Sequence, residues 1–243
     1  MKRLQEIVEH KGRPGSRFIL LAITALLAAI SLSYELMLGH VLSAFFGNTV
    51  FQYSLTIGIY MLAMGIGAFV SEHKLFQNSL KRLVQTELAL SLVGGSALFL
   101  SHLLWWTNMS EVLFTASIYL LIVAIGVLTG LEIPLLARIG EQHHGIKENT
   151  VLGIDYAGAF IGALLFAFVL YPFVGLVGTA LILGITNAFA GLILIERYGR
   201  DHLKKLFGSA LGLLSLCVMF AAALIFADLI DGYLFSHYIN ARV

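Results

Sequence analysis

The chain is 243 residues long, with 59% hydrophobic residues, only 12% charged residues and a formal net charge of +1. Globular proteins carry about 25% charged residues, so this composition excludes a soluble domain. The near-neutral charge argues against a nucleic-acid partner. The single cysteine, Cys217, excludes a disulfide framework and a cysteine-based metal site.

Seven apolar stretches are each long enough to cross a bilayer, which takes about 20 helical residues. Short charged loops or turns separate them, so we expect an all-α polytopic membrane helix bundle that forms one domain over residues 18–229. Residues 1–17 are then a cytoplasmic segment and residues 230–243 a short outer tail. The predicted spans are Phe18–His40, Thr49–Ser71, Leu83–Trp105, Val112–Ile133, Val151–Tyr171, Leu176–Ile195 and Leu206–Leu229.

The basic residues predict the orientation. All 15 Lys and Arg residues except Arg242 lie before the first predicted span or in alternate connections between spans. Because Lys and Arg are enriched on the cytoplasmic side of membrane proteins, we expect a multi-pass inner-membrane protein with a cytoplasmic N-terminus. Trp105, Trp106 and Tyr171 then lie near the outer interface as an aromatic belt.

Four acidic residues lie within the predicted spans, without Lys or Arg at the same depth: Glu35, Glu87, Glu132 and Asp155. A charge at the bilayer centre costs about 3 kcal/mol or more, so such groups face the interior, pair, or hold a proton or cation. Glu87 lies near a cytoplasmic span end, where we expect it to reach the interface or Arg82. The other three are the stronger site candidates, with hydrogen bonding between helices as an open alternative.

The polar features recur along the chain. Glu132 follows Glu35 by 97 positions, and Asn149-Thr150-Val151 follows Asn48-Thr49-Val50 by 101. Three spans in each unit make the second unit inverted, so we predict an inverted 3 + 3 repeat over about residues 18–105 and 112–195, with an extra helix at 206–229. Inverted repeats with a site at their interface recur in secondary transporters. Chance similarity between apolar helices is the alternative.

Several of these runs, in this order, carry a family resemblance: Tyr34-Glu35-Leu36, Gly47-Asn48, Gln52-Tyr53-Ser54, Gly130-Leu131-Glu132-Ile133-Pro134 and Gly153-Ile154-Asp155-Tyr156. Over about residues 20–195 the chain resembles the transmembrane region of bacterial membrane-bound spermidine synthase-like proteins, a polyamine aminopropyltransferase family. The resemblance implies helices that precede a soluble aminopropyltransferase domain with a Rossmann-like fold. The chain contains no strand followed by a glycine-rich nucleotide loop, so we expect it to lack that catalytic domain.

These observations predict that the protein binds or transports a small cation such as a polyamine. Carboxylates and tyrosine rings suit ammonium groups through charge and cation–π contact. The alternative is a membrane anchor and oligomerisation module for a separately encoded soluble aminopropyltransferase. We expect no catalytic residue, metal or cofactor; the expected partners are the lipid bilayer, a polyamine, a soluble synthase and a second copy of the chain. The candidate ligand-binding residues are Tyr34, Glu35, Gln52, Tyr53, Glu132, Asp155 and Tyr156.

Three further motifs have weaker interpretations. His40 and His102, near outer span ends, are a candidate haem pair without a second pair or attachment motif. His143-His144 lies in a cytoplasmic loop, where a solvated turn is favoured over a metal site. Pro134 is expected to break the fourth span.

Overall fold

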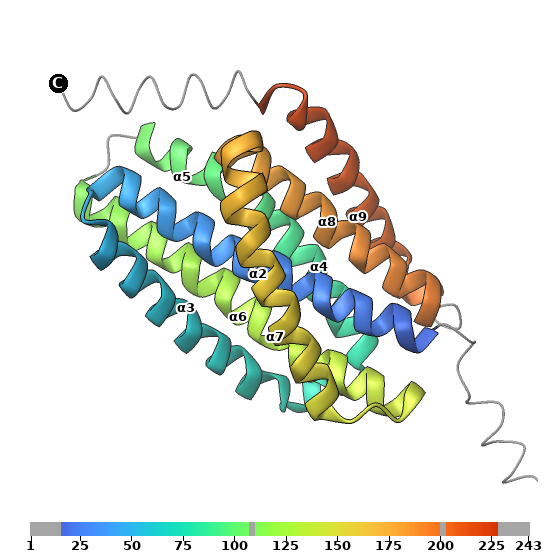
Figure 1. Cartoon of the computed structure of the whole chain (residues 1–243). Helices are drawn as coiled ribbons and strands as arrows, with labels where there is room; N and C mark the ends of the chain where they lie inside the picture. Colours follow the sequence, from blue (N-terminus) through green and yellow to red (C-terminus); the bar gives the residue numbers. More distant parts are fainter. Residues whose placement is uncertain (1–15, 107–109, 200–202, 228–243) are drawn as a thin grey trace, which may run out of the picture.

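The computed structural model describes residues 16–106, 110–199 and 203–227, and within these ranges all regular structure is helical (Figure 1). The predicted all-α class is therefore confirmed. The long helices lie side by side or cross one another in an elongated bundle (Figure 1). The elements are α2 (Ser16–Phe46), α3 (Thr49–Ser71), η1 (Lys74–Phe76), α4 (Ser79–Gly95), α5 (Ala97–Trp106), α6 (Glu111–His144), α7 (Glu148–Leu165), η2 (Phe166–Val174), α8 (Gly175–Tyr198) and α9 (Leu203–Leu224).

Five helical stretches in the described ranges are long and apolar enough to cross a membrane. One of them, Glu148–Tyr198, contains α7, η2 and α8. The chain reverses direction within it at Gly175, whose φ of 76° favours glycine (Figure 1). Helices α4 and α5, bent by 45° at their junction, make a sixth candidate span if taken together. The first six predicted spans thus fall on helical segments, as does the seventh as far as Leu224, and α3 has the predicted bounds. The last two residues of the seventh predicted span and the predicted outer tail lie outside the described residues.

The expectation that Pro134 breaks the fourth span is wrong. Helix α6 continues through Pro134 to His144. Proline removes one backbone hydrogen bond and crowds the carbonyl of the residue four positions earlier, here Gly130. That residue lies directly on the backbone of Met64 in α3, and Leu135 and Leu136 are buried in the core. Packing on both sides of the proline therefore holds the helix together.

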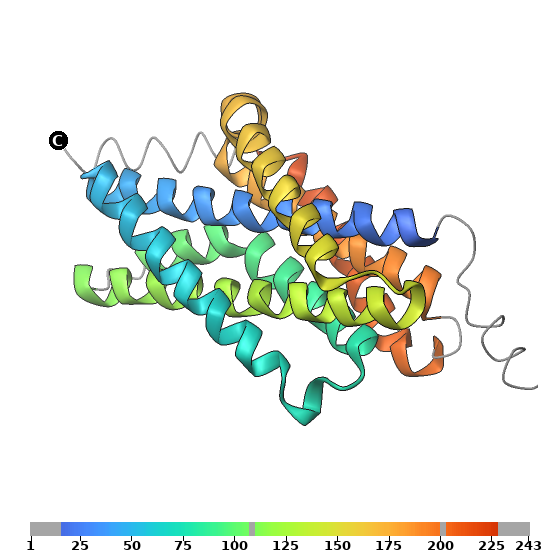
Figure 2. The same cartoon turned by 60° about the horizontal axis from the view of Figure 1, so that its bottom comes forward.

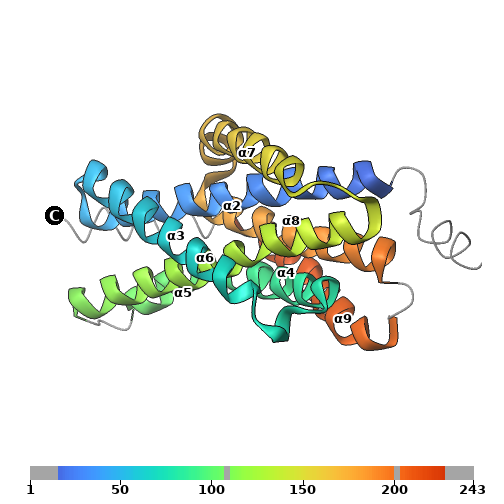
Figure 3. The ribbon, with the colours of Figure 1, turned by 90° about the horizontal axis from the view of Figure 1, so that it is seen from below.

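Two close helix crossings organise the bundle. Helix α3 packs along α6, and α7 packs along α2, more extensively than any other described pair. Figures 2 and 3 show α7 crossing the middle of α2, and α3 crossing α6 on another side of the bundle. Gly158 of α7 lies against the backbone of Ala25, and Gly67 of α3 lies against the carbonyl of Val127. Small residues permit such backbone contact in apolar helices.

Helices α4 and α8 pack against each other and connect the two crossings. The hydroxyl of Ser91 in α4 donates a 2.7 Å hydrogen bond to the carbonyl oxygen of Gly184 in α8. Helix α9 packs against both α8 and α4, and its Phe220 lies against Gly95 and Gly184. This arrangement places the faces of α2, α4, α6 and α8 toward a common interior.

Alanine substitutions on α3 test the crossing. In G67A, the new Cβ would collide with the carbonyl of Val127, so we expect a lower thermal midpoint, equivalent to a loss of about 1–3 kcal/mol. G65A is the matched control, because a Cβ there meets no atom within 4 Å. That variant should match the wild type or gain up to about 1 kcal/mol from helix propensity. Circular dichroism melts in detergent measure both, and equal midpoints would contradict the crossing.

Candidate functional site

Acidic side chains from three helices meet in the interior of the bundle. Glu132 of α6 interacts electrostatically with Glu87 of α4 and with Asp155 of α7. Tyr34 of α2 is wholly buried and interacts with both glutamates. Glu87 is 0% exposed and Glu132 4% exposed, whereas Asp155 is only partly buried. Of the predicted site residues, Tyr34 and Glu132 are therefore buried in the interior, and Asp155 lies at its edge.

Tyr60 of α3 links this cluster to Glu35. Its hydroxyl group donates to the carbonyl oxygen of Ser31 in α2 at 3.2 Å, and it lies 3.0 Å from the hydroxyl of Thr129 in α6. Tyr60 also interacts electrostatically with Glu35 and Glu132. One buried tyrosine thus joins three helices through its hydroxyl group.

The prediction that Glu87 reaches the interface or Arg82 is wrong. Arg82 instead donates hydrogen bonds to the carbonyl oxygen of Leu75 and to the side chain of Gln85. Glu87 faces α8, where a Cβ on Gly191 would lie 3.2 Å from the Cβ of Glu87. The glycine leaves room for the glutamate between α4 and α8. Packing against α8 determines which face of α4 turns inward. The position of Glu87 along the predicted span does not determine it.

Two other predicted residues lie apart from the acidic cluster. Gln52 of α3 accepts a 3.1 Å hydrogen bond from the hydroxyl of Tyr119. The hydroxyl of Tyr53 lies 3.1 Å from Nδ1 of His40, whose ring is 4.4 Å from that of Tyr171. These contacts join α2, α3, α6 and η2 nearer the α2–α3 turn. His40 thus has a hydrogen-bonding partner in Tyr53 and a ring contact with Tyr171.

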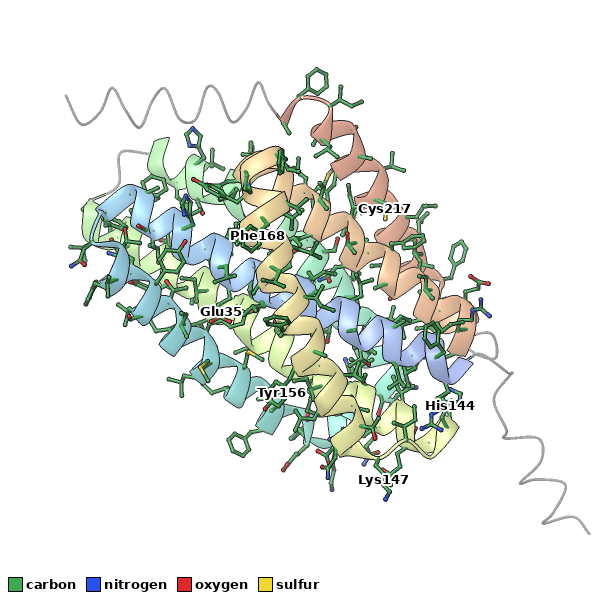
Figure 4. All side chains as sticks on the ribbon, in the orientation of Figure 1. Glu35, His144, Lys147, Tyr156, Phe168 and Cys217 are labelled. Atoms are coloured by element: carbon green, nitrogen blue, oxygen red, sulfur yellow. The ribbon has the colours of Figure 1, made fainter. Side chains whose placement is uncertain are left out.

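Tyr156 points away from the cluster. It is 66% exposed on the outer side of α7, whereas Glu35 lies in the middle of the bundle (Figure 4). His144 lies at the end of the bundle (Figure 4), and its Nε2 is 3.0 Å from the hydroxyl of Tyr198. Within the described ranges, no group of three or more His, Cys, Asp or Glu residues is arranged to hold a metal ion.

Asn187 of α8 belongs to the same interior although the predicted site omits it. It is 1% exposed, and neither its amide nitrogen nor its oxygen has a hydrogen-bond partner among the described residues. Gly184 and Gly191, three residues before and four after it, contact α4 at Ser91 and Glu87. Asn187 therefore faces α4 between these two levels. The pattern of a lone Asn flanked by glycines at helical spacing is the sequence signal for this position.

The enclosed carboxyl groups dominate the electrostatics of the site. Two like charges about 4 Å apart repel by about 4 kcal/mol at an effective dielectric constant of ~20. Removing each charge from water costs several kcal/mol more. No Lys or Arg is among the described groups that act on Glu87 or Glu132. The interior therefore disfavours two ionised carboxylates here.

Comparison with known proteins gives several related sequences. The chain is 37% identical over 169 residues to a polyamine aminopropyltransferase of Leptospira interrogans, which is 69% of this chain and 33% of that protein. It is 34% identical over 221 residues to polyamine aminopropyltransferase 1 of Streptomyces coelicolor, or 89% and 40% of the two chains. The chain resembles polyamine aminopropyltransferases. A further relative, polyamine aminopropyltransferase 2 of Ralstonia nicotianae, is 37% identical over 179 residues.

The alignments cover about a third to two fifths of the length of these curated relatives. No family model matches the chain, and no solved structure matches it. The polyamine-related resemblance is thus supported by the names of the relatives. Whether the match concerns their membrane region alone stays a prediction.

The predicted function is contradicted by these relatives. They are named as enzymes that transfer aminopropyl groups, so cation binding or transport is the wrong function for this chain. The alternative of a membrane anchor for a separate synthase is wrong for the same reason. Buried carboxylates within apolar helices were assigned to a ligand, whereas Glu35 and Glu132 are enclosed by protein.

A tyrosine substitution tests whether the interior network holds the helices together. Y60F removes the hydroxyl that contacts Ser31 and Thr129 and leaves the interior hydroxyl of Thr129 without this partner. We expect a loss of about 1–3 kcal/mol in unfolding free energy. Y156F is the matched control, since its side chain is 66% exposed, and should change stability little. Chemical or thermal unfolding in detergent distinguishes them, and an unchanged Y60F would refute the proposed link.

Proposed function

We propose that the chain functions in aminopropyl transfer in polyamine metabolism, as the helical part of a polyamine aminopropyltransferase. The observation that carries this proposal is the 34% identity to the Streptomyces coelicolor enzyme across 89% of the chain. Similar identities to enzymes of the same name in Leptospira interrogans and Ralstonia nicotianae support it.

Aminopropyl transfer requires an amine nitrogen to attack the terminal carbon of an aminopropyl group. The new carbon–nitrogen bond forms as the bond from that carbon to its leaving group breaks, and the amine gives up a proton. Glu87 and Glu132 are enclosed by α2, α4, α6 and α8. We therefore assign these two residues to maintaining the helical framework, without contact to the reacting amine.

We also propose that the helices lie in a membrane with the N-terminal end of α2 on the cytoplasmic side. Five described stretches have the required length and hydropathy. Lys74, Arg138 and Lys147, with other basic residues, occupy alternate connections or nearby helix ends, as expected for cytoplasmic loops.

The helix crossings support the proposed inverted repeat. Ala29 of α2 contacts Gly162 of α7, and Gly126 of α6 contacts Ala63 of α3. Gly126 follows Ala29 by 97 positions, which is also the offset between the two repeated glutamates, and Gly162 follows Ala63 by 99. If α2 is exchanged with α6 and α3 with α7, the α2–α7 crossing is therefore mapped onto the α3–α6 crossing. These contacts align Asp155 with Thr56, two positions from the alignment that the Asn-Thr-Val runs predict.

Loss of the protein should change the polyamine content of its host. We expect deletion of its gene to lower the pool of aminopropylated polyamines, and the wild-type gene to restore that pool. Membranes from the complemented strain should convert a labelled diamine into a product longer by one aminopropyl group, detected by mass spectrometry. Complementation with G65A, at an open surface position, should succeed equally. An unchanged polyamine profile and no labelled product above the deletion background would refute the function.

Single cysteines test the proposed orientation. In a C217S background, N48C lies in the α2–α3 turn and K74C in η1, at opposite ends of α3, and both native side chains are exposed. A membrane-impermeant maleimide applied to intact cells should label N48C. It should label K74C only after the membrane is permeabilised, because that position is expected in the cytoplasm. The reverse pattern would invert the topology, and labelling of both in intact cells would exclude a membrane crossing by α3.

A further inference from the structure

Three polar side chains buried around the middle of α4 have no hydrogen-bond partner within the part of the chain that the structure describes. Tyr34 of α2 and Glu87 of α4 are 0% exposed, and Asn187 of α8 is 1% exposed. The unpartnered atoms are the hydroxyl of Tyr34, both carboxyl oxygens of Glu87 and both polar atoms of the Asn187 amide. Buried polar atoms in native proteins are nearly always bonded to protein or to ordered water. These side chains therefore indicate a ligand that offers hydrogen bonds.

The antiparallel packing of α4 and α8 places Asn187 one turn of α4 beyond Glu87. At one level, a Cβ on Gly191 would lie 3.2 Å from the Cβ of Glu87. At the other, the hydroxyl of Ser91 donates a 2.7 Å hydrogen bond to the carbonyl oxygen of Gly184. Asn187 lies about one turn from each of these glycines on the same face of α8. Its amide is therefore near the level of Ser91.

Tyr34 lies a further turn along α4. A Cβ on Gly94 would lie 2.8 Å from the hydroxyl oxygen of Tyr34. Gly94 follows Ser91 by three residues and Glu87 by seven, so all three positions lie on one face of α4. The three unpartnered groups thus follow this face at successive turns, about 5.4 Å apart along the helix.

This spacing suits water as the ligand. A direct hydrogen bond joins heavy atoms about 2.7–3.2 Å apart, whereas one water molecule that makes two such bonds spans about 5–6 Å. That span matches one helical turn. Water donates and accepts, so it can bond to a phenol, an amide and a carboxyl group in turn. Buried water molecules typically make about three hydrogen bonds to polar groups that the protein itself leaves unpartnered.

We propose that a short chain of ordered water molecules binds along α4, from Glu87 past Asn187 to Tyr34. The water molecules bridge the three side chains and connect α2, α4 and α8 in the interior of the bundle. This inference concerns the helical framework and does not depend on aminopropyl transfer.

Nuclear magnetic resonance of the whole protein in lipid nanodiscs tests the site directly. The probe is water, whose magnetisation is transferred to the side-chain amides of protein labelled with ¹⁵N-asparagine. The amide of Asn187 should receive magnetisation from water although it is buried, and N187L should remove that signal. The exposed amide of Asn78 is the positive control. Transfer to Asn78 without transfer to Asn187 would overturn the proposal. The wild-type spectrum decides this even if N187L does not fold.

The stability of N187L separates a hydrated amide from a dry one. Leucine has a similar size and removes the hydrogen-bonding atoms. If water binds Asn187, the variant should lose about 2–4 °C in its thermal midpoint, the effect of about one hydrogen bond. If the amide were dry, leucine would remove an unsatisfied buried group and raise the midpoint. An unchanged or higher midpoint would therefore overturn the proposal. N149L, at an exposed position, is the matched control and should change little.

A double variant tests whether one chain of water connects the ends of the site. Y34F and N187L should each lower the thermal midpoint. Groups that share a hydrogen-bond network do not contribute independently, so Y34F/N187L should lose less than the sum of the two single losses. Additive losses would overturn the continuous chain between Tyr34 and Asn187.

Discussion

Backbone contact between helices at small residues is the constraint on which the rest of this structure depends. Gly158 and Gly162 bring α7 onto the backbone of α2, and Gly67 and Gly130 bring α3 onto α6. Apolar helices gain little from the hydrophobic effect when lipid surrounds them, so close packing and interhelical hydrogen bonds supply their cohesion. The crossings also determine which polar side chains meet inside.

The interior that results from these crossings is polar but enclosed. Tyr60 connects α2, α3 and α6 through its hydroxyl group, and Ser91 joins α4 to α8. Between these bonds lie carboxyl groups for which the described residues supply few donors. Buried polar networks of this kind specify one arrangement of helices when their members are satisfied.

Much of the fold was predictable from local patterns. The bounds of α3 follow from an apolar run that begins after Asn48, whose side chain accepts a hydrogen bond from the Phe51 N–H, and ends before Glu72. The break of the α6 helix at Pro134 was predicted wrongly, because a local rule cannot include the packing of Gly130 on α3. The site was only partly predictable. Tyr34 and Glu132 are buried in the interior, whereas Tyr156 is exposed.

The sequence by itself determined the class of structure: an apolar helical chain with four acidic residues in its predicted spans, basic residues in alternate connections and a polyamine-related resemblance. These properties depend on composition and order, which need no contacts. Only the tertiary structure decided that Glu87 is wholly buried beside α8 and that Asn187 faces α4. A helix can turn any of its faces inward, and the choice depends on where neighbouring helices offer a glycine, such as Gly191 beside Glu87. Such pairwise fits join residues far apart in the chain, so no local pattern contains them.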